Sequence, residues 1–90
     1  MKSATGAMTL EELRKQIDLI DEKLVELINQ RAQIAVQIGQ VKQGRNDPVY
    51  VPHREKEVLD KIAALNKGPL PNKVLFAVWR ELMSGSFCLE

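Results

Sequence analysis

Polar side chains interrupt the apolar faces of the helices that this sequence predicts. Arg31 stands inside an apolar stripe with Lys42 near the same face, and Glu55 stands on another apolar face beside Arg54. Because a buried charge costs several kcal/mol unless it is paired or hydrogen-bonded, scattered accidents of this kind are rare in a small core. Two further polar residues lie one turn apart near the C-terminal end, Ser86 and Glu90. A single polar cavity lined by all of these side chains would explain why they interrupt apolar faces.

The spacing of the cations indicates what such a cavity would bind. Arg31 and Lys42 are 11 positions apart, which places them on nearly the same helix face about 16 Å apart along the axis. Arg14 precedes Arg31 by 17 positions, about 25 Å along the same helix, so it cannot share that site within one chain. The Arg14 of a second copy could share it if the two helices run antiparallel. Several cations with few carboxylates suit a small dianion bound by arginine.

The first of the elements that position these residues is a long helix. Thr9 and Glu12 form a capping box, and Met8 with Leu13 can form the hydrophobic staple across it. Steps of three and four then continue to Gly44, which predicts one helix of about 35 residues and about 50 Å. The stripe consists of Leu10, Leu13, Ile17, Ile20, Leu24, Leu27, Arg31, Ile34, Ile38 and Val41.

Two shorter helices follow. The proline-containing segment "GRNDPVYVP" predicts a loop, and a second helix is expected from Pro52 to Asn66, with a stop at Lys67-Gly68. After "GPLP" a third helix begins near Pro71 or Asn72 and runs to the end. The residues of the second helix expected to face inward are Val58, Leu59, Ile62 and Leu65. Those expected to share one side of the third helix are Leu75, Val78, Trp79, Leu82 and Ser86.

The predicted fold is therefore all-α, with three helices and a very long first helix. Two helices of about 15 and 19 residues can bury the apolar stripe of the first helix only if the chain folds back on it without gaps. Pairing the long helices of two chains buries the stripe without that requirement. Apolar spacing sustained over more than four heptads supports such pairing. Pairing of this kind predicts an intertwined homodimer, although a simple coiled coil has no need of two further capped helices.

Composition narrows the class of function. With 13 Lys and Arg against 12 Asp and Glu, the chain lacks the basic patch typical of nucleic-acid binding. No apolar run reaches the roughly 18 residues that span a bilayer. A single cysteine, Cys88, favours a reducing, cytoplasmic setting. Residues 1–8 are expected to be a flexible tail, followed by one domain over residues 9–90.

Three stretches together resemble the all-helical chorismate mutases: "LRKQIDLIDEKLVELINQRAQIAVQIGQVK", then "REKEVL" after a proline-containing loop, then "WRELMSGSFCLE". The ending and "NKGPL" are most similar to the mutase domain that precedes a prephenate dehydratase in bifunctional proteins. The resemblance covers residues 9 to 90. It implies an intertwined homodimer that converts chorismate to prephenate in phenylalanine and tyrosine biosynthesis. It also implies a native chain that continues into a C-terminal prephenate dehydratase domain.

The resemblance further implies a role for each polar residue. Arg14 reaches from the partner copy to one substrate carboxylate, and Arg31 binds the other. Lys42 donates to the ether oxygen and also contacts a carboxylate, while Arg54 reinforces carboxylate binding. The remaining expected contacts are Glu55 with the ring hydroxyl, the backbone N–H of Val51 beside it, Ser86 with a carboxylate, and Glu90 with the ether oxygen. No metal or cofactor is implied, since the [3,3] rearrangement needs none.

Other interpretations of the same residues stay open. Arg31 by itself is typical of a coiled-coil flank, Glu55 with Arg54 can simply cap a helix, and Arg14 can pair with Asp18. Within the same fold, an isochorismate-pyruvate lyase is the nearest rival activity. A non-catalytic helical dimerisation module, or a mutase that needs an activating partner, is also compatible. Glu90 stands where other members carry glutamine, and a carboxyl group donates to an ether oxygen only when it is protonated.

Overall fold

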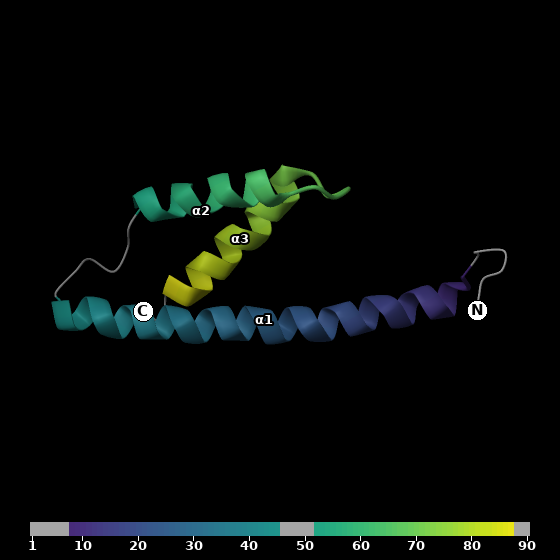
Figure 1. Ribbon diagram of the computed structural model, residues 1–90, viewed down its shortest axis with the longest axis horizontal. Coiled ribbons are helices and arrows are strands. Elements are labelled where there is room, and N and C mark those ends of the chain that lie inside the picture. The colour runs from purple at the N-terminus through teal and green to yellow at the C-terminus, as the bar shows by residue number, and fades with distance from the viewer. Residues whose placement is uncertain (1–7, 46–51, 88–90) are drawn as a thin grey trace. The chain divides into compact units, whose positions relative to one another are not determined.

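The computed structural model describes residues 8–45 and 52–87, and within these ranges it contains three α-helices and no strand (Figure 1). Helix α1 spans Leu10–Arg45, α2 spans Pro52–Leu65 and α3 spans Asn72–Phe87. The all-α prediction is confirmed. Residues 1–30 and 31–90 form two separate compact units, so α1 contributes to both. Over the described ranges, none of the helices combines the length and apolar character needed to cross a membrane.

The start of α1 follows the local signals in the sequence. The Thr9 backbone N–H donates to Glu12 Oε1 at 2.9 Å, and the Glu12 N–H donates to Thr9 Oγ1 at 3.1 Å, which confirms the predicted capping box. The Gln16 amide donates to the Met8 sulfur at 3.3 Å. At its other end the helix continues one residue past Gly44. Its 36 residues agree with the predicted length.

The first unit leaves its apolar side chains uncovered. Every residue from Thr9 to Gln30 is exposed, and the large aliphatic side chains among them are 39–63% exposed. A single helix has no second layer against which to bury an apolar stripe, and such a helix is marginal in water by itself. The exposed aliphatic residues of this unit are Leu10, Leu13, Ile17, Leu19, Ile20, Leu24, Val25, Leu27 and Ile28.

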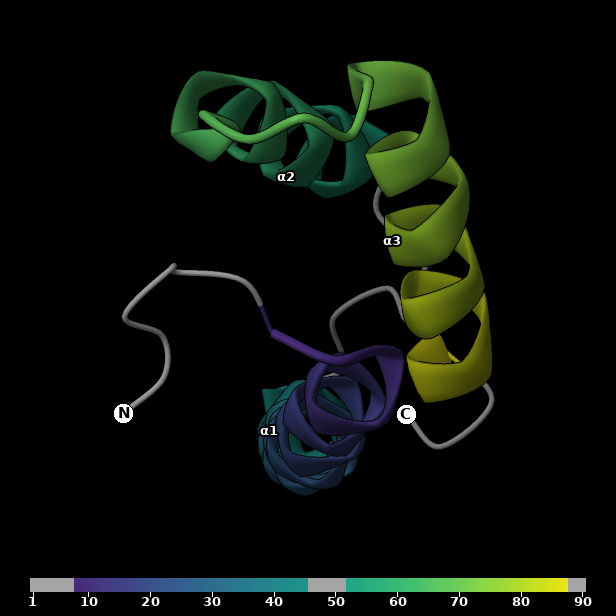
Figure 2. The ribbon, with the colours of Figure 1, turned by 90° about the vertical axis from the view of Figure 1, so that its right-hand side faces the viewer.

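In the second unit, α2 and α3 pack against each other next to the turn that joins them (Figure 2). Asn66 organises this turn: its amide donates to the Leu70 carbonyl at 2.9 Å and to Asn72 Oδ1 at 2.7 Å. Its own side-chain oxygen accepts from the Gly68 N–H at 3.2 Å. The end of α2 is thereby tied to the first residue of α3.

Each of these two helices has one partly buried face. Leu65, which was expected to face inward, is 65% exposed in the single chain, and Val78, which was expected on the same side as Leu75 and Trp79, is 43% exposed. At 100° per residue, each lies roughly 90–100° from the centre of the partly buried face of its helix. The partly buried apolar residues are Val58, Leu59, Ile62 and Ala63 in α2, and Leu75, Phe76, Trp79, Leu82 and Met83 in α3.

Candidate functional site

The part of α1 that belongs to the second unit carries two cations on its most buried line. Arg31, Ala35, Gly39 and Lys42 follow one another at steps of four, four and three, which keeps them on one helix face. Ala35 is only 6% exposed and Gly39 is buried, while Arg31 and Lys42 are partly buried. Because the residues between the cations are the two smallest, no bulky side chain on this line shields one charge from the other.

Arg31 lacks a counter-charge within the part of the chain that the structure describes. Among those residues, its guanidinium makes no hydrogen bond or ion pair, whereas Lys42 does make an interaction. Removing a cation from water without a counter-charge is unfavourable, and a guanidinium presents five N–H donors in a planar fork that fits a carboxylate or a phosphate. The environment of Arg31 therefore suits an anionic ligand.

The first turn of α2 supplies a carboxylate and a second guanidinium. Glu55 is partly buried and lies on the same face as Ile62 and Asn66, seven and eleven positions later, so the expectation that it stands on an apolar face is confirmed. A carboxylate in the first turn is also favoured by the positive end of the helix dipole. Unlike the partly buried Glu55, Arg54 has a mostly exposed side chain, at 66%.

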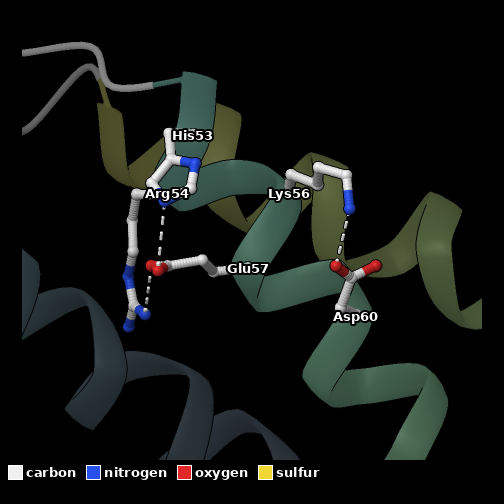
Figure 3. Close-up of polar contacts among 5 residues, drawn as sticks. All are labelled: His53, Arg54, Lys56, Glu57 and Asp60. Atoms are coloured by element: carbon white, nitrogen blue, oxygen red, sulfur yellow. Dashed lines mark hydrogen bonds and ion pairs between the residues drawn. The ribbon is translucent and has the colours of Figure 1, made fainter.

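Arg54 is held by a residue that sequence reasoning did not single out. Its Nη1 lies 3.5 Å from Oε1 of Glu57, and the other oxygen of the same carboxylate lies 3.4 Å from His53 Nε2 (Figure 3). Glu57 thus contacts two neighbouring basic residues at once. The available signal was the spacing, since His53 and Arg54 precede Glu57 by four and three positions, which are the separations at which helical side chains meet.

A separate ion pair lies one turn further along α2. Lys56 Nζ donates to Asp60 Oδ2 at 2.8 Å, and this hydrogen bond together with the carboxylate charge raises the pKa of Lys56 above its ordinary value (Figure 3). Both side chains are mostly exposed, at 75% and 67%. Lys56 lies on the exposed side of α2, away from the face that carries Glu55, and it is not one of the residues predicted for the candidate anion site.

Arg31, Lys42, Arg54 and Glu55 all belong to the second unit, whereas Arg14 belongs to the first. Among the described residues α2 packs against α3 and not against α1, so the structure does not bring the two α1 cations together with Arg54 and Glu55. Arg14 forms no ion pair with Asp18 or any other described residue. The prediction for Ser86 falls in α3, but its side chain lies outside the described part of the chain, as do Val51 and Glu90. In the described ranges, no three His, Cys, Asp or Glu residues are grouped so that they could hold a metal ion.

Known proteins resemble this chain in both sequence and fold. The chain is 45% identical over 85 residues to a bifunctional chorismate mutase/prephenate dehydratase of Aquifex aeolicus, a match that covers 90% of this chain and 24% of that protein. The chain thus spans about a quarter of the length of the curated relatives it matches first. A chorismate mutase of Thermus thermophilus superposes with a TM-score of 0.86 and 29% identity, covering 89% of this chain and 91% of that one.

A second solved structure carries a bound molecule. The chorismate mutase of Helicobacter pylori, determined in complex with prephenate, superposes with a TM-score of 0.81 and 32% identity over 89% of this chain and 87% of that one. A family model described as chorismate mutase type II matches residues 13–90. That match includes all three helices except the first turn of α1, and with it the cationic line and the start of α2. The chain belongs to the chorismate mutase type II family.

Proposed function

We propose that this chain catalyses the rearrangement of chorismate to prephenate. The observation that carries the proposal is the partly buried Arg31, which has no counter-charge among the described residues and shares the most buried line of α1 with Lys42. The substrate is a dicarboxylate, so it supplies the negative charge that this environment lacks. Membership of the chorismate mutase type II family and the prephenate complex of the Helicobacter pylori protein support the same substrate class.

In this proposal the residues divide between holding the substrate and acting on the breaking bond. Arg31 binds one carboxylate with its planar fork, and Arg54 reinforces carboxylate binding. Lys42 donates to the ether oxygen and stabilises the negative charge that develops there as the C–O bond breaks. Glu55 accepts a hydrogen bond from the ring hydroxyl. Fixing both carboxylates selects the compact reactive conformer, which removes much of the ordering entropy from the barrier.

Three further contacts belong to the proposal and lie outside the described side chains. The backbone N–H of Val51 assists at the ring hydroxyl, Ser86 binds a carboxylate, and Glu90 faces the ether oxygen. Glu90 has to be protonated to donate there, because an ionised carboxylate only accepts hydrogen bonds. A pH dependence of the reaction follows from this requirement.

We also propose that the working form is a homodimer in which Arg14 of one copy completes the site of the other. The uncovered stripe of the first unit supports this: Leu13, Ile17, Ile20 and Leu24 are 44–57% exposed in a single chain. A second copy offers an identical apolar stripe, and a two-fold pairing buries the same patch on both subunits. Arg14, which has no ion pair within its own chain among the described residues, is then available to the partner's substrate.

The likeness to bifunctional relatives supports a wider proposal for the native protein. Since the chain covers only 24% of the Aquifex aeolicus relative, a prephenate dehydratase domain following this one in a longer native chain fits the comparison. The mutase would then deliver its product to the next domain. The single cysteine favours the cytoplasm as the place where both reactions occur.

The direct test is to follow the loss of chorismate by absorbance with the purified 90-residue chain, and to identify the product by chromatography. The proposal expects prephenate, formed without added metal or cofactor. Pyruvate released from isochorismate would instead identify the lyase of the same fold. No turnover of either substrate by a folded dimer would favour a non-catalytic dimerisation module.

A further inference from the structure

The contact between Glu57 and Arg54 bears on how tightly the substrate binds. Arg54 is proposed to hold a substrate carboxylate, yet without ligand its Nη1 lies 3.5 Å from Glu57 Oε1. That carboxylate is an acceptor of the same kind as the one carried by the substrate. The two carboxylates are therefore competitors for one guanidinium.

The direction of the contact follows from the helix geometry. At 100° per residue, Glu57 lies between His53 and Arg54 around the axis of α2, about 60° from Arg54 on the side away from Glu55. Glu55 lies about 100° from Arg54 in the opposite sense, on the partly buried face. The close-up shows the Arg54 and Glu57 side chains turned toward each other (Figure 3). Glu57 thus draws the guanidinium away from the face that carries Glu55.

The geometry of the contact also shows that it is weak enough to be exchanged. At 3.5 Å it is longer than a normal N–H···O hydrogen bond, whereas the neighbouring Lys56–Asp60 contact is 2.8 Å. The Glu57 carboxylate is shared with His53 at 3.4 Å, and its side chain is 51% exposed. Exposed ion pairs of this kind contribute little, so a bound dianion can displace Glu57.

We infer that Glu57 lowers the substrate affinity of this site, because its carboxylate pairs with Arg54 and has to be displaced from the guanidinium by the substrate carboxylate. The inference rests on the proposed function. Glu57 contacts Arg54 and is not among the residues proposed to touch the substrate, so it acts through the guanidinium. Its removal should change binding and leave the chemical step as it is.

The test compares KM and kcat for chorismate in the wild-type chain and in Glu57→Gln, which removes the charge and keeps the shape. We expect KM to fall about 1.5- to 5-fold with kcat unchanged, the range that corresponds to an exposed ion pair. Glu57→Asp, which keeps the charge, should leave KM within a factor of about two of wild type. Asp60→Asn is the matched control, because it removes the same charge one turn away on α2 from a carboxylate that contacts Lys56 and not Arg54.

A double mutant separates an effect through Arg54 from general repulsion. In an Arg54→Gln background, Glu57→Gln should no longer change KM, because the guanidinium for which it competes is gone. An equal KM in wild type and Glu57→Gln, a rise in KM, or the same fall in Asp60→Asn would overturn the inference while leaving the mutase activity intact. Absence of turnover by the wild-type chain would overturn the proposed function itself.

Discussion

The uncovered stripe of α1 gives a prediction whose size follows from the structure. Leu24 lies on the stripe and is 48% exposed in a single chain. Fully burying a leucine side chain contributes about 1.5–3 kcal/mol, so covering the remaining half contributes about 0.7–1.4 kcal/mol per copy. A symmetric interface counts this twice, which gives about 1.4–2.9 kcal/mol per dimer. Leu24→Ala should therefore weaken dimerisation by up to roughly 10- to 100-fold.

Leu19 provides the control for this prediction. It is the same residue type on the same helix and is 59% exposed, yet it lies about 140° from Leu24 around the axis and is not part of the stripe. Sedimentation equilibrium over a range of chain concentrations should show a weaker dimer for Leu24→Ala and an unchanged one for Leu19→Ala. Equal dissociation constants for the two variants, or a wild-type chain that is monomeric throughout, would refute the two-fold pairing through this stripe.

Three further predictions concern the site and the scaffold. Lys42→Ala should lower kcat by about 10²–10³-fold or more while the dimer persists, as expected for loss of a donor to the oxygen that becomes negative, and normal turnover would remove Lys42 from the mechanism. Glu90→Gln, whose amide donates a hydrogen bond at any pH, should retain more activity than the wild-type chain at alkaline pH, and an unchanged pH profile would exclude Glu90 as the hydrogen-bond donor to the ether oxygen. Asn66→Ala, which removes the donors to Leu70 and Asn72, should lower the free energy of unfolding by about 1–2 kcal/mol in urea titrations at fixed chain concentration, with kcat retained.

Local chemistry made much of the fold predictable. The capping box at Thr9, the start of α2 at Pro52 and the start of α3 at Asn72 depend on a few neighbouring residues, and the structure confirms all three. Leu65 was expected to face inward but is exposed in the single chain, and so is Val78, which was expected on the apolar side of its helix. Helical spacing shows which side chains share a face, but it does not show how wide a strip the neighbouring helix covers.

Less of the candidate site than of the fold could be predicted from the sequence. Interrupted apolar faces pointed to Arg31 and Glu55, and the structure confirms that both are partly buried. The contact of Glu57 with Arg54 was not anticipated, because a charged residue on an exposed helix face has many possible partners at similar cost. The proposed contribution of Arg14 from a second chain depends on pairing through the exposed apolar stripe of α1. The sequence identifies this stripe but does not show what covers it.

Mixing two inactive variants tests the shared site most directly. Arg14→Ala and Lys42→Ala chains are unfolded together in equal amounts and refolded, so that half of the dimers contain one chain of each kind. If each site takes Arg14 from one copy and Lys42 from the other, one of the two sites in every mixed dimer is intact, and about a quarter of wild-type activity should return. An Arg31→Ala and Lys42→Ala mixture should stay inactive, because both residues belong to the same copy in every site. Activity no greater than the average of the two separate variants would contradict a site completed by the partner's arginine.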